Sequence, residues 1–160
     1  MKKLLKNKKI VFFDIDYTLF NVDIFKKSDL KRYENYQEVE NVLKILSKKF
    51  SLGIFSEGEE NFQREKLNKT GIEKYLDQGH IYIMQGKNLL IKKTFERYKE
   101  NTIFLVDDKL TILSQVKSIY PNVFTIWVKR GEYAEKQESI KGFIPDVQVT
   151  DLNELRNIIQ

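Results

Sequence analysis

Several residue types are missing or scarce in this chain of 160 residues. It has no cysteine, which excludes disulfides, cysteine-ligated zinc or iron–sulfur sites and thiol catalysis. Its only histidine is His80, so a histidine-rich metal site is excluded and a Ser-His-Asp triad is disfavoured. We interpret His80 as a structural or surface residue. No apolar run approaches the ~18 residues of a membrane span. The basic N-terminus has only Leu4-Leu5 as an apolar stretch, which is too short for a secretory signal, and we expect a cytoplasmic protein without a membrane partner.

The net charge of +5 raises the question of nucleic-acid binding. Only five of the 28 basic residues are arginine, whereas sites that read bases favour arginine for its two-pronged hydrogen bonding. We therefore favour a solvated, lysine-rich surface over a dedicated nucleic-acid face, and leave open a weak electrostatic preference for polyanions.

The chain has the length of one domain, and its apolar runs alternate with helical patterns. This alternation predicts an α/β fold with a mostly parallel sheet. Residues 147–150 are a candidate for a short last strand, and no clear element is predicted over 21–32. The predicted strands are 10–13, 51–55, 80–84, 102–106 and 123–128, and the predicted helices are 35–49, 59–68, 88–99, 110–119 and 152–159, the last opened by a capping box of Asp151 and Glu154.

Polar residues stand directly after three of these strands. Asp14 and Asp16 follow the first, Ser56 follows the second, and Asp107 and Asp108 follow residues 102–106. The carboxyl ends of parallel strands meet at one sheet edge, so these side chains are expected to converge. Each pair of carboxylates about 5 Å apart repels by roughly 3 kcal/mol, and oxygen ligands without His or Cys favour Mg²⁺ as the neutralising ion. Turn formation is the alternative explanation for the aspartates.

Three segments resemble motifs of the haloacid dehalogenase (HAD) superfamily of phosphohydrolases. Residues 11–20 (VFFDIDYTLF) resemble the family's DxDx[TV]-L signature, residues 53–56 its Ser/Thr motif, and residues 104–108 its double-aspartate motif. The resemblance extends from Ile10 to about Ile159. It implies an HAD-like Rossmannoid fold, a three-layer sandwich whose five-stranded, mainly parallel sheet has the order 5-4-1-2-3.

The resemblance also implies roles for the site residues. Asp14 is expected to be the nucleophile that forms an aspartyl-phosphate, and Asp16 the general acid and base. The metal ligands implied are Asp14, the backbone carbonyl of Asp16, Asp107 and Asp108, while Ser56 and a lysine bind phosphate.

The phosphate-binding lysine has three candidates, Lys87, Lys92 and Lys93. Lys87 follows Gly86 in a loop expected at the same sheet edge as Asp14, whereas Lys92 and Lys93 are expected further along the following helix. We favour Lys87 and leave Lys92 as the alternative.

The sequence departs from the family pattern at two places. Thr111 and Ile112 stand where many members carry a further metal-binding Asp, and Tyr17 replaces a common Gly, which narrows the expected entrance. Asp16, by contrast, argues against a dehalogenase, since that branch lacks this acid.

The spacing of the motifs leaves no room for a full cap domain over the site. About 40 residues separate Asp16 from Ser56, and about 30 separate Ser56 from Lys87. We therefore expect one domain over 1–160, with a short flap around 20–28 and an open site.

The predicted function is Mg²⁺-dependent hydrolysis of a phosphate monoester through an aspartyl-phosphate. An open site favours a macromolecular substrate such as a phosphoprotein or a nucleic-acid end, and a small sugar phosphate or nucleotide remains the alternative if a partner subunit closes the site. A phosphotransferase or mutase of the same fold, or a non-catalytic binding protein, are the alternative functions. The sequence leaves the oligomeric state open.

Overall fold

The computed structural model describes residues 8–160, and the N-terminal segment on which the signal-peptide argument rests falls mainly outside this range. Strands and helices alternate along the chain, with short 3₁₀ turns at Glu73–Tyr75, Gln78–His80, Lys87–Leu90, Glu96–Tyr98 and Leu152–Glu154. The strands are β1 (Lys9–Phe13), β2 (Ser51–Glu57), β3 (Ile81–Met84), β4 (Thr102–Asp107), β5 (Phe124–Val128) and β6 (Val147–Val149). The helices are α1 (Val22–Lys27), α2 (Val39–Leu46), α3 (Glu60–Lys69), α4 (Ile91–Phe95), α5 (Leu110–Ile119), α6 (Gly131–Lys136) and α7 (Leu155–Ile158).

The strands form one sheet in the order β3-β2-β1-β4-β5-β6, and every neighbouring pair is parallel. The α/β class and the predicted relative order of the first five strands are confirmed. The predicted number of strands is wrong, because β6 adds a sixth at the β5 edge, where Ile126 pairs with Val147. The candidate for a short last strand over 147–150 is confirmed as β6, which pairs with β5.

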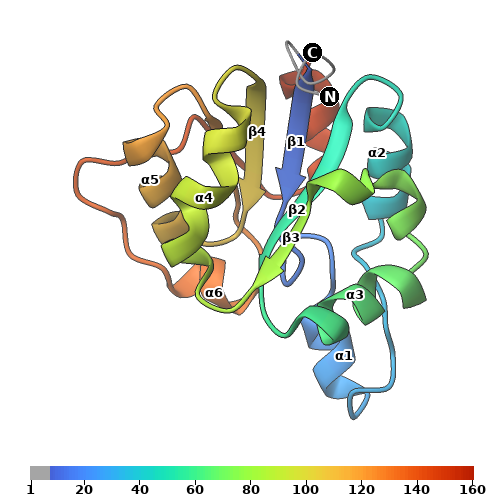
Figure 1. Ribbon diagram of the computed structural model, residues 1–160. Coiled ribbons are helices and arrows are strands. Elements are labelled where there is room, and N and C mark those ends of the chain that lie inside the picture. Colours follow the sequence, from blue (N-terminus) through green and yellow to red (C-terminus); the bar gives the residue numbers. More distant parts are fainter. Residues whose placement is uncertain (1–7) are drawn as a thin grey trace.

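Alternating side chains of β1 face two separate cores. Val11 and Phe13 pack on one side of the sheet with residues of α2 and α7, whereas Ile10 and Phe12 pack on the other with residues of α4 and α5. Figure 1 shows α4 and α5 on one side of the strands and α2 on the other. Because the strands are buried on both faces, they read in the sequence as continuous apolar runs.

Two predicted helices are shorter or more broken than expected. The helix predicted over 35–49 is reduced to α2, and the one over 88–99 is divided into a 3₁₀ turn, α4 and a second 3₁₀ turn. Leu90, with φ −104° and ψ 6°, leaves helical geometry and causes the first division. The helix over 110–119 matches α5, and the predicted capping box of Asp151 and Glu154 is present.

The carboxyl ends of the strands lie at the lower edge of the sheet in Figure 1, where α1, α3 and α6 are also found. His80 lies on the α4 side of the sheet, is buried, and its Nδ1 is 2.9 Å from the hydroxyl of Tyr98, as expected for a structural residue. Within residues 8–160, none of the helices combines the length and apolarity needed to cross a bilayer.

Candidate active site

Three buried aspartates meet where β1 and β4 end. Asp14 follows β1, and its backbone N–H donates to the carbonyl of Val106 in β4 at 2.9 Å. Asp107 is the last residue of β4, and Asp108 follows it. The three carboxylates each place an oxygen within 4.8 Å of the others. Parallel pairing of β1 with β4 therefore brings together residues about 90 positions apart in the sequence.

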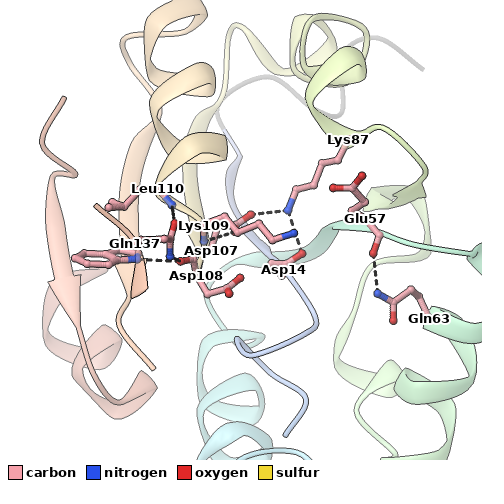
Figure 2. A network of polar contacts seen from close by, with 10 residues as sticks. Asp14, Glu57, Gln63, Lys87, Asp107, Asp108, Lys109, Leu110 and Gln137 are labelled. Carbon is pink, nitrogen blue, oxygen red and sulfur yellow. Dashed lines mark hydrogen bonds and ion pairs between the residues drawn. The ribbon is translucent and has the colours of Figure 1, made fainter. Parts of the chain in front are cut away.

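Lys87 lies between two of these aspartates (Figure 2). Its Nζ donates to Oδ1 of Asp14 at 3.0 Å and to Oδ2 of Asp107 at 2.5 Å, and its side chain is 2% exposed. Burial disfavours the ammonium, but the carboxylates of Asp107 and Asp14 outweigh this and raise the pKa of Lys87. Lys87 is therefore a fixed positive charge, and Lys92 and Lys93 lie exposed on α4, away from this group.

The loop before Lys87 depends on Gly86 and Glu57. Gly86 has φ 66° and ψ 45°, the left-handed conformation that glycine adopts without strain. Its backbone N–H donates to Oε1 of Glu57 at 3.2 Å. Glu57 ends β2 immediately after Ser56, so one short segment both carries Ser56 and helps to hold the loop of Lys87.

Asp108 has no partner for its carboxylate, although its backbone is well held. The carbonyl of Asp108 accepts from Nε1 of Trp127 at 2.9 Å and from Nε2 of Gln137 at 2.7 Å, and Oε1 of Gln137 accepts from the backbone N–H of Leu110 at 2.7 Å (Figure 2). Both carboxylate oxygens are buried without a hydrogen bond. Burial, with the nearby charges of Asp14 and Asp107, raises the pKa of Asp108 to about 9.

The unpartnered oxygens fit a hard divalent cation. Lys87 pairs with Asp14 and Asp107 but not with Asp108, so one of the three buried carboxyl groups has no cation in contact with it. Burial also raises the pKa of Asp107, although Lys87 opposes this shift. An oxygen-only donor set without His or Cys is the set that Mg²⁺ prefers. Asp14, Asp107 and Asp108 are therefore the residues that could hold such an ion.

Ser56 shares a cavity with these acids. Its hydroxyl is buried and has no hydrogen-bond partner in the protein. The cavity has a volume of about 220 Å³. Its lining residues include Asp14, Asp16, Tyr17, Val22, Lys26, Ser56, Glu57, Asp108, Lys109 and Tyr133.

Asp16 lines the same cavity, but its carboxylate is not part of the three-aspartate group. Nζ of Lys66 lies 2.7 Å from its Oδ1 and 3.0 Å from its Oδ2, and Nε2 of Gln63 donates to Oδ2 at 3.2 Å. Both partners come from α3. The predicted role of the Asp16 backbone carbonyl as a metal ligand stays a prediction.

Tyr17 forms part of the cavity wall in a conformation that is unusual for a side-chain-bearing residue. Its φ is 60°, and its ring packs against Gly131 so closely that a Cβ on Gly131 would lie 2.2 Å from the ring. The hydroxyl accepts from Nζ of Lys26 at 3.3 Å, and the ring makes an edge contact with Tyr133, with ring centroids 5.6 Å apart. Tyr17 and Tyr133 therefore form an aromatic part of the cavity wall, and the narrowing of the entrance by Tyr17 stays a prediction.

The sequence interpretation missed four polar residues of this region, Glu57, Gln63, Lys66 and Gln137. The sequence does contain a signal for Gln63 and Lys66, because with Leu67 they occupy positions i, i+3 and i+4 on the buried face of α3. Gln137 left none, because its role depends on the tertiary placement of the segment after α6.

Comparison with solved structures shows which known fold this is. A haloacid dehalogenase-like hydrolase of Burkholderia xenovorans superposes with a TM-score of 0.78 at 21% identity, covering 96% of this chain and 97% of that one. The fold is that of the HAD-like hydrolases. The HAD-hydrolase YfnB of Bacillus subtilis, whose structure is described as bound to magnesium, has a TM-score of 0.74 at 13% identity and covers 97% of this chain and 100% of its own.

Other structures with the HAD-like fold include a Clostridium difficile protein that is named as a phosphatase and proteins that are named as dehalogenases. The L-2-haloacid dehalogenase of Xanthobacter autotrophicus, described with chloropropionic acid covalently bound, has a TM-score of 0.68 at 12% identity, with 95% and 98% of the two chains covered. Comparisons with family models and with curated proteins find no match. The comparisons thus establish the HAD-like fold and leave the reaction to be argued from the site.

Proposed function

We propose that this protein is a Mg²⁺-dependent phosphate monoester hydrolase that works through an aspartyl-phosphate on Asp14. The observation that carries the proposal is the group of side chains at the carboxyl edge of the sheet, of which Asp14, Ser56 and Asp108 line one cavity. Three buried carboxylates, a buried ammonium and an unpartnered buried hydroxyl supply a nucleophile, a cation site and phosphate ligands together.

Asp14, Asp107 and Asp108, with the carbonyl of Asp16, are the proposed ligands of Mg²⁺. When bound, the ion supplies positive charge that offsets the repulsion among the carboxylates and polarises the phosphoryl group. Such an ion would be a partner for the Asp108 oxygens, which have no hydrogen-bond partner in the protein, and would account for a carboxylate retained in a buried position.

Asp14 is the proposed nucleophile. Because Lys87 contacts its Oδ1, we assign the attack on phosphorus to Oδ2. The bond from phosphorus to the ester oxygen breaks as the new bond to Asp14 forms, and Asp16 gives a proton to the departing alcohol. Water then attacks phosphorus, Asp16 takes a proton from it, and the bond to Asp14 breaks to release inorganic phosphate.

Ser56 and Lys87 are the proposed phosphate ligands. The Ser56 hydroxyl has a free proton to donate, and the Lys87 ammonium is held rigidly by two carboxylates. Donors that are already oriented stabilise the charge of a transition state without reorganising.

The dehalogenases among the similar structures make haloacid hydrolysis the competing reaction. A halide leaves without needing a proton, whereas the alcohol of a phosphate ester needs one. Asp16, on the wall of the cavity that contains Asp14, offers such a proton donor and favours ester hydrolysis.

We further propose an open site and a phosphorylated macromolecular substrate, such as a phosphoprotein or a nucleic-acid end. Between Asp16 and Ser56 the chain forms only α1 and α2, and between Ser56 and Lys87 only α3 as an α-helix. Neither segment supplies a domain-sized cover.

A product assay tests the proposal. The purified protein with Mg²⁺ is incubated with phosphorylated metabolites, phosphopeptides, phosphorylated oligonucleotides and L-2-chloropropionate, and free phosphate and halide are measured. Phosphate release that is lost in Asp14→Asn is the expected result. Halide release without phosphate release would contradict the proposal, and transfer of phosphate to an acceptor other than water would indicate a phosphotransferase.

A further inference from the structure

A second buried lysine, Lys66, lies beside the cavity and takes no part in the group around Asp14. Its side chain is 5% exposed. It occupies the inward face of α3 with Gln63 and Leu67, where an apolar side chain would pack without the cost of burying a charge. A buried ammonium at such a position needs an explanation beyond stability.

Asp16 is the partner that compensates this charge. Nζ of Lys66 is 2.7 Å and 3.0 Å from the two carboxylate oxygens, and across residues 8–160 no other carboxylate comes within 4.0 Å of it. The ammonium also lies 5.1 Å from the ring centroid of Phe20 and 4.4 Å from that of Phe62, so aromatic faces hold it from other directions. The ammonium thus has contacts with two aromatic rings in addition to its contact with Asp16.

Gln63 adds a third fixed contact to the same carboxylate. Its Nε2 donates to Oδ2 of Asp16 at 3.2 Å and to the carbonyl of Glu57 at 2.8 Å (Figure 2 shows the second bond). Glu57 directly follows Ser56, so Gln63 connects the carboxylate of Asp16 to the strand end that carries a proposed phosphate ligand.

The carboxylate of Asp16 is therefore held on one side and open on the other. The Asp16 side chain is 36% exposed and lines the cavity that contains Asp14 and Ser56. We propose that Lys66 is a positioning residue, which fixes the carboxylate of Asp16 for proton transfer to and from the reacting oxygens; this inference rests on the proposed phosphatase function.

Leaving-group chemistry separates positioning from a merely structural role. A loss of proton transfer slows kcat/KM for an alkyl phosphate, whose alcohol leaves poorly, far more than for 4-nitrophenyl phosphate, whose phenolate leaves unaided. Misplacing a catalytic group by about 1 Å costs up to about 100-fold in rate. A general weakening of the fold would lower both values alike.

The experiment measures kcat/KM with Mg²⁺ for both esters in the wild type, Lys66→Met, Lys66→Arg, Asp16→Asn and the double variant Lys66→Met/Asp16→Asn. Lys69→Met is the matched control, since Lys69 lies one turn further along α3 and pairs with Glu65 at the surface. Far-ultraviolet circular dichroism serves as the folding check for each variant.

We expect Lys66→Met to lower kcat/KM for the alkyl ester about 10- to 100-fold and kcat/KM for the nitrophenyl ester less than about 3-fold. Lys66→Arg should recover part of the loss, Lys69→Met should match the wild type, and Lys66→Met should add nothing in the Asp16→Asn background. Equal losses on both esters, or additive losses in the double variant, would overturn the positioning role. A wild type that hydrolyses neither ester nor any other phosphate would overturn the proposed function, and this inference with it.

Discussion

Asp108→Asn is expected to stabilise the metal-free protein while removing its response to Mg²⁺. In the unfolded chain this carboxyl has a pKa of 3.8 and is ionised at pH 7, whereas the metal-free folded protein holds it at a pKa of about 9 and must protonate it. Each pH unit between 3.8 and 7 costs about 1.4 kcal/mol, which gives about 4 kcal/mol of lost stability.

Asparagine needs no proton, but its amide donors lack acceptors and cost ~1–3 kcal/mol. The net gain at pH 7 is therefore about 1–3 kcal/mol, or roughly 2–12 °C in Tm for a chain of this size. Because the pKa of Asp108 is raised in the folded protein, this carboxyl destabilises the fold increasingly as pH rises from 3.8 toward 9. The difference in stability between Asp108→Asn and the wild type should therefore shrink from pH 7 toward pH 5.

The assay is thermal unfolding in EDTA and in Mg²⁺, at pH 5 and pH 7. Asp29→Asn, the same change at an exposed position, is the control and should unfold like the wild type. Mg²⁺ should raise the Tm of the wild type and of Asp29→Asn more than that of Asp108→Asn. A metal-free Asp108→Asn variant less stable than the wild type at pH 7, or one stabilised equally by Mg²⁺, would refute the reasoning.

Four further outcomes follow from the site. Asp14→Asn should abolish turnover of an aryl phosphate while far-ultraviolet circular dichroism stays unchanged, and near-normal turnover would remove Asp14 from the nucleophile role. Lys87→Ala should lose ~2.7–4 kcal/mol of transition-state stabilisation, as removed oxyanion donors do, and Lys92→Ala should be nearly silent; the reverse order in kcat/KM would exclude Lys87 as the phosphate ligand. EDTA should abolish phosphate release and added Mg²⁺ should restore it. Full activity in EDTA would contradict a catalytic metal site at the three aspartates. Phosphorylated polymers should compete at least as well as small phosphates in kcat/KM, and a strong preference for one small metabolite would show that the site closes.

The positions of the site residues were more predictable from sequence than their contacts. Asp14, Ser56 and Asp107 follow short apolar runs that are typical of buried parallel strands, and strand direction then brings them to one edge. Lys87 could be placed because Gly86 marks a tight turn after the predicted strand. The number of strands and the breaks in the helix over 88–99 depend on pairing and backbone angles that no local pattern records.

The partner of Asp16 was not predictable in the same way. A sequence pattern puts Asp16 near Asp14, but whether its carboxylate faces the other aspartates or α3 depends on how α3 packs over the end of β2. The inward-facing Gln63 and Lys66 bind the carboxylate of Asp16 and orient it toward α3. Their place in the site follows from the packing of α3 and not from a local sequence pattern.

Trapping the intermediate tests the central claim most directly. The protein is quenched with acid during steady-state turnover of a ³²P-labelled aryl phosphate with Mg²⁺, and the labelled peptide is identified by mass spectrometry. The account predicts label on Asp14, acid-stable and base-labile as an acyl phosphate is, and its loss in Asp14→Asn. Label on another residue, or continued turnover by Asp14→Asn, would contradict it.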